Sequence, residues 1–372
     1  MKRMIWMALA ICILFCGCGS AAPGTEPTQT LTTAPSTQAS TTQSTTQAVT
    51  VPSQPVTQPT TQPTQTEPIM LYQNPLNGEP MAEPYMGRPA AIMLNNHMQA
   101  MPQFGVGEAD ILYEVLAEGG ITRCMGIYSD IASVERLCSI RSARKYYVDI
   151  LRGYDAWYIH AGGSAEADAY MKNIGLNHLD GTIADCDYFK RDNDRLNAGY
   201  SSEHTLYTTG QWVVSGAAKK GFDLTRENAD YGMIFDDKAV IVGQSAEKLT
   251  VYFNMGGKPG SYTKSTAFTY DPDTKLYSAA QHGGAYVDAS TGTTVTFRNI
   301  LVLRMATSVQ SDGQLLTINT TGSGSGYFIC NGQLVNIKWS RNSATQPFTY
   351  TLENGTPITF GVGSTYIGVV PT

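Results

Sequence analysis

Residues 142–173 read SARKYYVDILRGYDAWYIHAGGSAEADAYMKN, and this stretch decides the fold class. Apolar residues at helical spacing predict a helix over residues 142–152. The aromatic and aliphatic run 155–161 predicts a strand. Ser164, at the end of His160-Ala-Gly-Gly-Ser164, is a good N-cap for a second helix over residues 164–173. A helix, a strand and a helix in succession are typical of a mixed α/β or α+β domain.

Towards the N-terminus, residues 89–94 (PAAIML) predict a buried strand that ends in Asn95-Asn96-His97. Residues 108–118 are apolar at helix-like spacing, and two glycines follow them. We predict a helix there; the alternative is a strand, because the stretch is only about ten residues long. Residues 121–129 and 134–140 predict two strands about a short turn.

The second half of the chain predicts a mostly antiparallel β domain. Turn formers, among them Asn331-Gly332 and Asn354-Gly355, separate short β-branched and aromatic runs. The predicted strands are residues 248–253, 266–270, 293–303, 314–319, 326–329, 333–339, 348–352 and 366–370. The run Gly322–Gly326 predicts a flexible loop rather than a nucleotide cradle, because neither a helix nor a GK[ST] sequence follows it.

The predicted fold is therefore α+β, with two folded domains. Residues 69–225 form a mixed α/β domain of layered helices and strands, and residues 226–372 form the β-rich domain. Of the 372 residues, 42% are apolar and 15% are charged, which excludes a wholly disordered chain and a coiled coil. The net charge of −6 and the lack of a basic stripe argue against a nucleic-acid partner.

The N-terminus predicts export and lipidation. Residues 1–18 read MKRMIWMALAICILFCGC, in which two cations precede an apolar run too short to span a bilayer stably. Small Gly17 before Cys18 resembles the bacterial lipobox, and Cys18 fits better than Cys16, which follows bulky Phe15. The alternative is an ordinary secretory signal. Diacylated Cys18 would anchor the chain in the cell membrane, on its extracytoplasmic side.

Residues 19–68 predict a disordered tether. Of the 47 residues from 21 to 67, 35 are Thr, Ser, Gln or Pro, and none is aromatic. Such a segment cannot bury enough apolar surface to offset its conformational entropy. We expect a spacer, and a plausible site of glycosylation, that holds the folded head away from the membrane.

Four strings carry a resemblance to a known family: Glu118-Gly-Gly-Ile-Thr-Arg123, Ile140-Arg-Ser-Ala-Arg144, His160-Ala-Gly-Gly-Ser164 and His204-Thr-Leu-Tyr-Thr208. In this order they resemble the YerB-like lipoprotein family, and the likeness covers residues 85–371. The resemblance implies a lipid-anchored chain with an N-terminal and a C-terminal domain of unknown function, the first a three-layer α–β structure. It implies no established activity.

The same strings suggest an anion site. Arg141, Arg144 and Lys145 would share the first turn of the predicted helix, where cations oppose the helix dipole. Guanidinium groups bind phosphate and carboxylate, and glycines with free N–H groups attract anions. The predicted ligand-binding residues are Arg123, Arg141, Arg144, His160, Gly162, Gly163 and Ser164. The alternative is a pair of structural salt bridges from the arginines to Glu114 and Glu118.

Catalytic and metal sites are weaker hypotheses. His160, His204 and Asp110 are candidate catalytic groups, although a buried structural histidine explains His160 equally well. A Ser-His-Asp hydrolase is disfavoured because Gly162–Glu166 lacks the second glycine of G-x-S-x-G. Glu114 and Glu118 would stack with Asp110 on a helix face, so Mg²⁺ or Ca²⁺ is conceivable as a cofactor. A solvated acidic face, or pairing with the arginines, is the favoured alternative.

Four cysteines follow Cys18. If residues 121–140 form a hairpin, Cys124 and Cys138 lie opposite one another, and an extracytoplasmic compartment would permit a disulfide. Buried free thiols are the alternative.

Three functions stay open. The first is a binding or scaffolding lipoprotein with an anion site, whose partner is a cell-wall component or an envelope protein. The second is a phosphotransferase or hydrolase acting on polyprenyl-phosphate-linked cell-wall precursors. It rests on a fainter resemblance to the LytR–CpsA–Psr phosphotransferases at Asp110, Ser139-Ile-Arg-Ser142 and His160–Gly163, without that family's Pro-Arg-Asp core. The third is a lipoprotein with no small ligand that docks another protein through its β domain.

Overall fold

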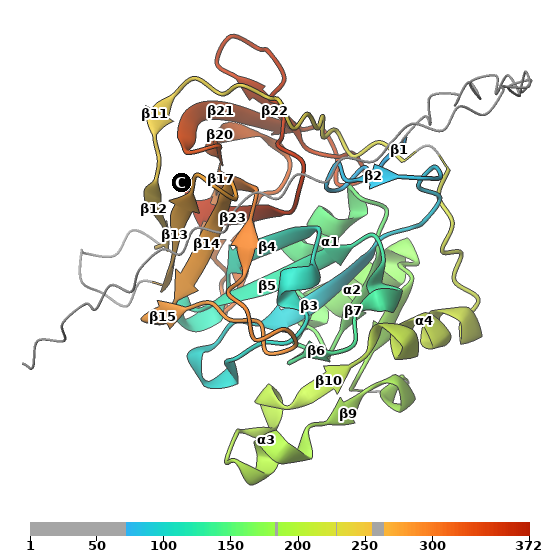
Figure 1. Ribbon diagram of the computed structural model, residues 1–372. Helices are drawn as coiled ribbons and strands as arrows, with labels where there is room; N and C mark the ends of the chain where they lie inside the picture. The colour runs from blue at the N-terminus through green and yellow to red at the C-terminus, as the bar shows by residue number, and fades with distance from the viewer. Residues whose placement is uncertain (1–71, 183–184, 228, 255–263) are drawn as a thin grey trace, which may run out of the picture. The chain divides into compact units, whose positions relative to one another are not determined.

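The computed structural model describes residues 72–182, 185–227, 229–254 and 264–372 (Figure 1). These residues belong to one compact unit, Thr66–Thr372. The predicted signal peptide, Cys18 and the predicted tether lie outside the described residues. Among those residues, no helix has the length and apolar character needed to cross a bilayer.

One large sheet contains eleven strands from both halves of the chain. Its order is β11 (Gln244–Ser245), β21 (Gln333–Arg341), β20 (Gly322–Cys330), β17 (Asn299–Met305), β23 (Thr365–Pro371), β4 (Ile111–Leu116), β5 (Thr122–Tyr128), β3 (Ala90–Asn95), β7 (Trp157–His160) and β8 (His178–Asp180), with β22 (Thr349–Leu352) beside β21. The two halves meet where β23 runs parallel to β4. In Figure 1 the C-terminal strand β23 therefore lies next to strands from the first half.

A second sheet comes entirely from the second half. It contains β12 (Lys248–Phe253), β13 (Lys264–Asp271), β14 (Leu276–Gln281) and β15 (Gly284–Ala285), and β16 (Thr296–Phe297) pairs with β14. Thr266 of β13 hydrogen-bonds Glu114 of β4, so this sheet covers one face of the large sheet. On the other face, the Tyr147 hydroxyl of α1 (Lys145–Arg152) donates to the carbonyl of Arg123 at 2.9 Å.

Smaller elements complete the described chain. These are the pairs β1 (Tyr72–Gln73) with β2 (Pro80–Met81) and β18 (Thr307–Val309) with β19 (Leu316–Ile318), a three-stranded sheet of β6 (Leu137–Cys138), β10 (Leu206–Thr208) and β9 (Lys190–Arg191), and the helices α2 (Ala165–Ile174), α3 (Asn193–Asn197) and α4 (Gly210–Lys219). The chain combines helices with several mainly antiparallel sheets, a mixed content that is compatible with the predicted α+β class.

The predicted helix over residues 108–118 is wrong. Residues Ile111–Leu116 form strand β4, which was the alternative, and all six are buried. Successive side chains of a strand point to opposite faces. Tyr113 points towards Tyr154, whereas Glu114 points towards Thr266. A strand covered on both faces can be apolar at every position, so its sequence resembles a helical pattern.

The predicted hairpin over residues 121–140 is also wrong. Residues Thr122–Tyr128 form β5 as predicted, but β5 pairs with β3 and β4. Only Leu137–Cys138 of the second run is a strand, and it pairs with β10 in another sheet. Cys124 and Cys138 are buried free thiols, because the hairpin that would place them together does not form. The possible disulfide is therefore not formed in this structure, and the alternative of buried free thiols holds.

The predicted first helical turn at Arg141–Lys145 is wrong as well. Helix α1 begins at Lys145, and Arg144 is extended, with φ −135°. Arg141, Arg144 and Lys145 therefore do not share a helical turn. The second predicted helix is confirmed, since the Ser164 hydroxyl caps α2 by accepting the N–H of Ala167.

The predicted strands of the second half are confirmed with two changes, whereas β11, β14, β15 and β18 were not predicted. Phe297 and Asn299 belong to different sheets, which divides the predicted strand 293–303 into β16 and β17. The Gly322–Gly326 run is not a loop but the first half of β20, paired with Ile337–Arg341. A Cβ atom on Gly326 would lie 2.4 Å from the carbonyl oxygen of Val302, so close packing requires this glycine. The Asn331-Gly332 turn joins β20 to β21 as predicted, with both residues at positive φ.

Candidate functional site

The predicted anion-binding residues come together beside an extended segment, residues 141–144. The N–H groups of Ala143 and Ala161 donate to the carbonyls of Gly162 and Arg141, which holds this segment against the glycine turn after β7. The side chain of Arg123 on β5 reaches the same segment and donates to the carbonyl of Ser142 at 3.3 Å. We call Arg123, Ser139, Arg141 and Arg144 the arginine cluster.

Two glutamates neutralise part of this charge. Glu118 accepts Arg144 Nε at 2.6 Å and Arg123 Nη2 at 3.1 Å. Burial would raise the pKa of Glu118, but the hydrogen bond from Arg144 and the charges of both arginines hold it below the usual range. Arg141 pairs with Glu203 at 3.0 Å, and this glutamate side chain is 53% exposed. The predicted salt bridges therefore exist to Glu118 but not to Glu114.

Three donors of the arginine cluster are buried without a hydrogen-bond partner among the described residues. They are Nε of Arg123, Nε of Arg141 and Oγ of Ser139. All three residues lie beside the end of β3. Arg123 is the cross-strand neighbour of Asn95, and the N–H of Asn95 donates to the carbonyl of Ser139. The N–H of Arg141 donates to the carbonyl of Met93. Buried donors are almost always satisfied in proteins, and each orphan costs about 1–3 kcal/mol. Within the described residues, these three donors therefore have no acceptor.

His160 is engaged on both ring nitrogens. Its Nδ1 lies 2.9 Å from the carbonyl of Gly162, so Nδ1 carries the proton. Its Nε2 then accepts from Nδ1 of His178 at 2.9 Å. Burial lowers the pKa of His160, and burial with the neighbouring His160 lowers that of His178 to about 4. The N–H of Gly162 also has a partner, because it donates a hydrogen bond to the carboxylate of Asp180. In this geometry His160 is a structural residue rather than a free base.

Of the other two catalytic candidates, His204 borders the arginine cluster through Asn95, whereas Asp110 lies apart. His204 Nδ1 accepts from the Asn95 amide at 2.8 Å, and its ring stacks on His97 with centroids 5.5 Å apart. Burial lowers the pKa of His204. Asp110 precedes β4, at the end of that strand opposite Glu118, where Asn77 and the N–H of Ser129 donate to it. The structure therefore does not bring Asp110 to Arg141 or His160.

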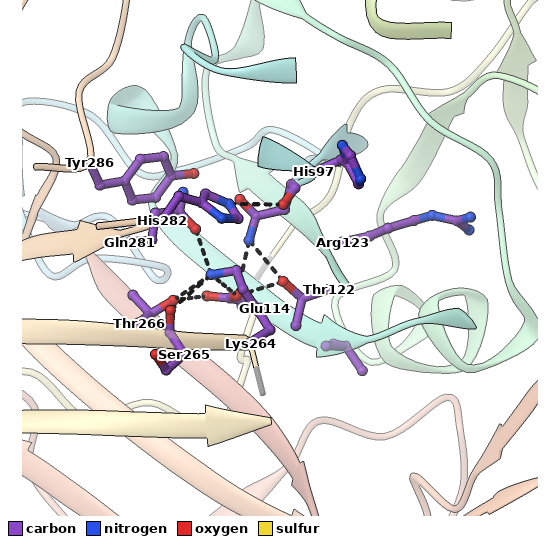
Figure 2. A network of polar contacts seen from close by, with 12 residues as sticks. His97, Glu114, Thr122, Arg123, Lys264, Ser265, Thr266, Gln281, His282 and Tyr286 are labelled. Atoms are coloured by element: carbon purple, nitrogen blue, oxygen red, sulfur yellow. Dashed lines mark hydrogen bonds and ion pairs between the residues drawn. The ribbon is translucent and has the colours of Figure 1, made fainter. Parts of the chain in front are cut away.

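A second polar network, which the sequence did not reveal, lies between the two sheets. Figure 2 shows the Lys264 ammonium group between Glu114, Thr266 and Gln281, with Arg123 pointing away. Lys264 Nζ lies 3.0 Å from Glu114 Oε1 and donates to Gln281 Oε1 at 2.7 Å. The exposed fractions of the two charged side chains are only 7% and 1%.

Glu114 accepts from five groups. Besides Lys264, they are the amide of Asn96, the hydroxyls of Thr122 and Thr266, and the hydroxyl of Tyr366. Burial alone would raise the pKa of Glu114, but the Lys264 charge and the threonine hydrogen bonds lower it below the usual range. Glu114 and Glu118 thus contact different cations. Within the described ranges, no three side chains of His, Cys, Asp or Glu are placed to hold a metal ion.

Comparison with known proteins assigns the chain to a family. The N-terminal and C-terminal domains of the protein of unknown function DUF3048 match residues 76–223 and 259–367. The chain belongs to the YerB-like family. It is 27% identical over 286 residues to the Bacillus subtilis (strain 168) protein named "Putative lipoprotein YerB", which covers 76% of this chain and 81% of that protein.

A solved structure supports this membership. The crystal structure of YerB from Bacillus subtilis matches with a TM-score of 0.71 at 26% identity, over 81% of this chain and 97% of that one. The resemblance carried by the four sequence strings is thus confirmed. In this YerB-like chain, the Glu114–Lys264 pair connects the two family domains, since each domain contributes one residue.

Proposed function

We propose that this chain is an extracytoplasmic lipoprotein, anchored to the cell membrane through Cys18, whose folded head binds an anionic ligand at the arginine cluster. The observation that carries the binding site is the set of orphan donors on Arg123, Ser139 and Arg141. Two positive charges and a hydroxyl group provide the donors that phosphate and carboxylate oxygens accept. The name of the Bacillus subtilis relative and the Gly17-Cys18 sequence support the anchor.

Thermal unfolding of residues Thr66–Thr372 tests the binding site, because these residues form one compact unit. The probes are inorganic phosphate, pyrophosphate and a polyprenyl pyrophosphate, each with and without Mg²⁺. A ligand at 100 times its Kd adds about 2.7 kcal/mol, which raises Tm by about 4 °C in a unit of this size. Arg141→Ala should remove this shift. Lys172→Ala, which deletes an exposed cation at the end of α2, should keep it.

No Tm shift with any probe would contradict the binding site. A shift without hydrolysis or transfer of phosphate supports binding alone, whereas Mg²⁺-dependent turnover would replace the binding function with phosphoryl chemistry. The anchor is tested separately. The Cys18→Ser chain should appear in the soluble fraction and should not incorporate labelled fatty acid, whereas the Cys16→Ser chain should stay in the membrane fraction.

A further inference from the structure

We propose that the groove beside β12 docks an extended, acidic segment of a partner polypeptide by strand addition. This surface is independent of the arginine cluster, which lies on residues of the first half of the chain. Three observations support it: an unpaired strand edge, an apolar floor and two cations without an acidic partner.

The strand edge belongs to the second sheet. Its order is β12-β13-β14-β15, and β12 pairs with β13 along Lys248–Phe253. Over the ranges that the structure covers, no strand pairs with the other edge of β12. Its outward N–H and C=O groups can therefore pair with an added strand, which is how many proteins bind extended peptides.

The groove runs between that edge and the adjoining part of the large sheet, on the face that the second sheet covers. Its volume is about 370 Å³. Leu249 and Val251 of β12 line one side. The floor consists of the cross-strand neighbours Val302 and Tyr327 together with Ile329 and Leu334. Side chains directly opposite one another share a face, so these four lie on one face, where Tyr327 and Leu334 are half-buried and Val302 and Ile329 are buried beneath. An added strand would place every second side chain on it.

The charges around the floor select an acidic segment. Arg304 follows Val302 by two residues on β17, so both point to the same face, and its guanidinium carbon lies 5.6 Å from the Tyr327 ring centre. Lys338 follows Leu334 by four residues on β21 and faces the same way. Among the described residues, neither cation forms a salt bridge. In a chain with a net charge of −6, two unpaired cations beside an apolar groove attract carboxylates.

The test uses the chain Thr66–Thr372 and a labelled eight-residue peptide of alternating valine and aspartate. Saturable binding is expected, together with protection of β12 amides from hydrogen exchange. A version N-methylated at alternate residues keeps the side chains but cannot form the ladder, and should bind at least tenfold more weakly. A valine–lysine peptide should bind equally poorly. Arg304→Glu should reverse this preference for acidic over basic peptides. Lys219→Glu, which makes the same reversal of charge on α4, should leave the preference intact.

Absence of saturable binding up to about 1 mM, the weak end of specific recognition, would overturn the proposal. Equal binding of the N-methylated peptide would also overturn it, because strand addition requires the backbone hydrogen bonds. If the chain dimerises and the dimer alone accounts for protection of β12, the occupant is a second copy and the acidic partner is excluded.

Discussion

Glu114 illustrates how a single buried residue shapes this molecule. It is an acid inside an otherwise apolar strand, with 1% of its side chain exposed. A buried carboxylate is tolerated only when a cation and hydrogen bonds compensate for its lost hydration. Lys264 and four uncharged donors provide that compensation, and three of the five partners come from the second half of the chain.

The first prediction concerns this pair. Lys264→Met should lower the free energy of unfolding by about 3–5 kcal/mol, because it leaves an uncompensated buried charge. The double variant Lys264→Met with Glu114→Gln should lose less than the sum of the two single variants, since it removes both charges. Urea unfolding of all four chains measures the coupling. Additive losses would show that the two charges do not interact.

The second prediction concerns Glu203, which occupies the exposed side of the arginine cluster. It pairs with Arg141, and an anionic ligand would compete with it for that guanidinium group. If the proposed site exists, Glu203→Gln should tighten phosphate binding severalfold, with a steeper loss of affinity as salt is added. Glu135→Gln removes the same charge from another exposed position and should change little. Calorimetric titration with phosphate compares the affinities of the wild type and the two variants. Weaker binding by Glu203→Gln would contradict the prediction and would mean that Glu203 helps to hold the ligand.

The third prediction concerns pH. The pKa of His178 in the folded chain is about 4, below the ordinary value of 6.5, because burial and His160 disfavour its charged form. The unfolded chain therefore binds protons first as the pH falls. Stability from this group is complete above pH 6.5 and decreases towards pH 4. Urea midpoints at pH 7 and pH 5 should differ more in the wild type than in His178→Gln. Equal differences would refute this.

At the scale of elements, close approach between strands determines where the sequence uses glycine. Gly326 lies in β20, and a Cβ atom there would meet the backbone of β17. A loop interpretation of Gly322–Gly326 assumes that glycine provides flexibility. In this chain it provides space, because β20 pairs with β17 on one edge and with β21 on the other.

The fourth prediction follows from this contact. Gly326→Ala should destabilise the fold by about 1–3 kcal/mol, because the new methyl group forces β20 away from β17. Gly284→Ala is the matched control: it also lies in a strand, its φ is not positive, and no atom lies within 4 Å of the added Cβ. It should change stability by less than about 0.5 kcal/mol. Denaturant midpoints compare the two variants, and equal losses would show that steric contact at Gly326 is unimportant.

At the scale of the whole molecule, the β4–β23 pairing unites segments that the sequence separates. The predicted boundary between residues 225 and 226 lies within one compact unit, and strands from both sides of it share the large sheet. If the two segments were separated, β4 would lose a neighbouring strand and Glu114 would lose Lys264, Thr266 and Tyr366.

The fifth prediction tests this unity. The chain Thr66–Thr372 should unfold in a single cooperative transition, whereas residues 66–225 alone should show no cooperative transition, because they expose a strand edge and an uncompensated buried acid. Circular dichroism at increasing temperature compares the two chains. A sharp transition in the shorter chain would show that the N-terminal family domain folds independently.

Features that depend on neighbours along the chain could be predicted from the sequence. Examples are strand β3, helix α2 with its Ser164 cap, and the Asn331-Gly332 turn, all encoded within a few residues. The strings that carry the family resemblance could also be recognised in the sequence, and the structure places Arg123 and Ser164 against the segment 141–144.

Only the tertiary structure decided which residues meet across long sequence separations. Strand β4 resembles a helix in sequence because the second sheet covers one of its faces and α1 the other, so both faces are apolar. The residues that bury these faces lie far along the chain, so the local sequence pattern does not reveal them. For the same reason the sequence could not identify Lys264 as the partner of Glu114, or β10 rather than β5 as the partner of β6. Local propensity determines single elements, whereas pairing depends on burial that the complete fold creates.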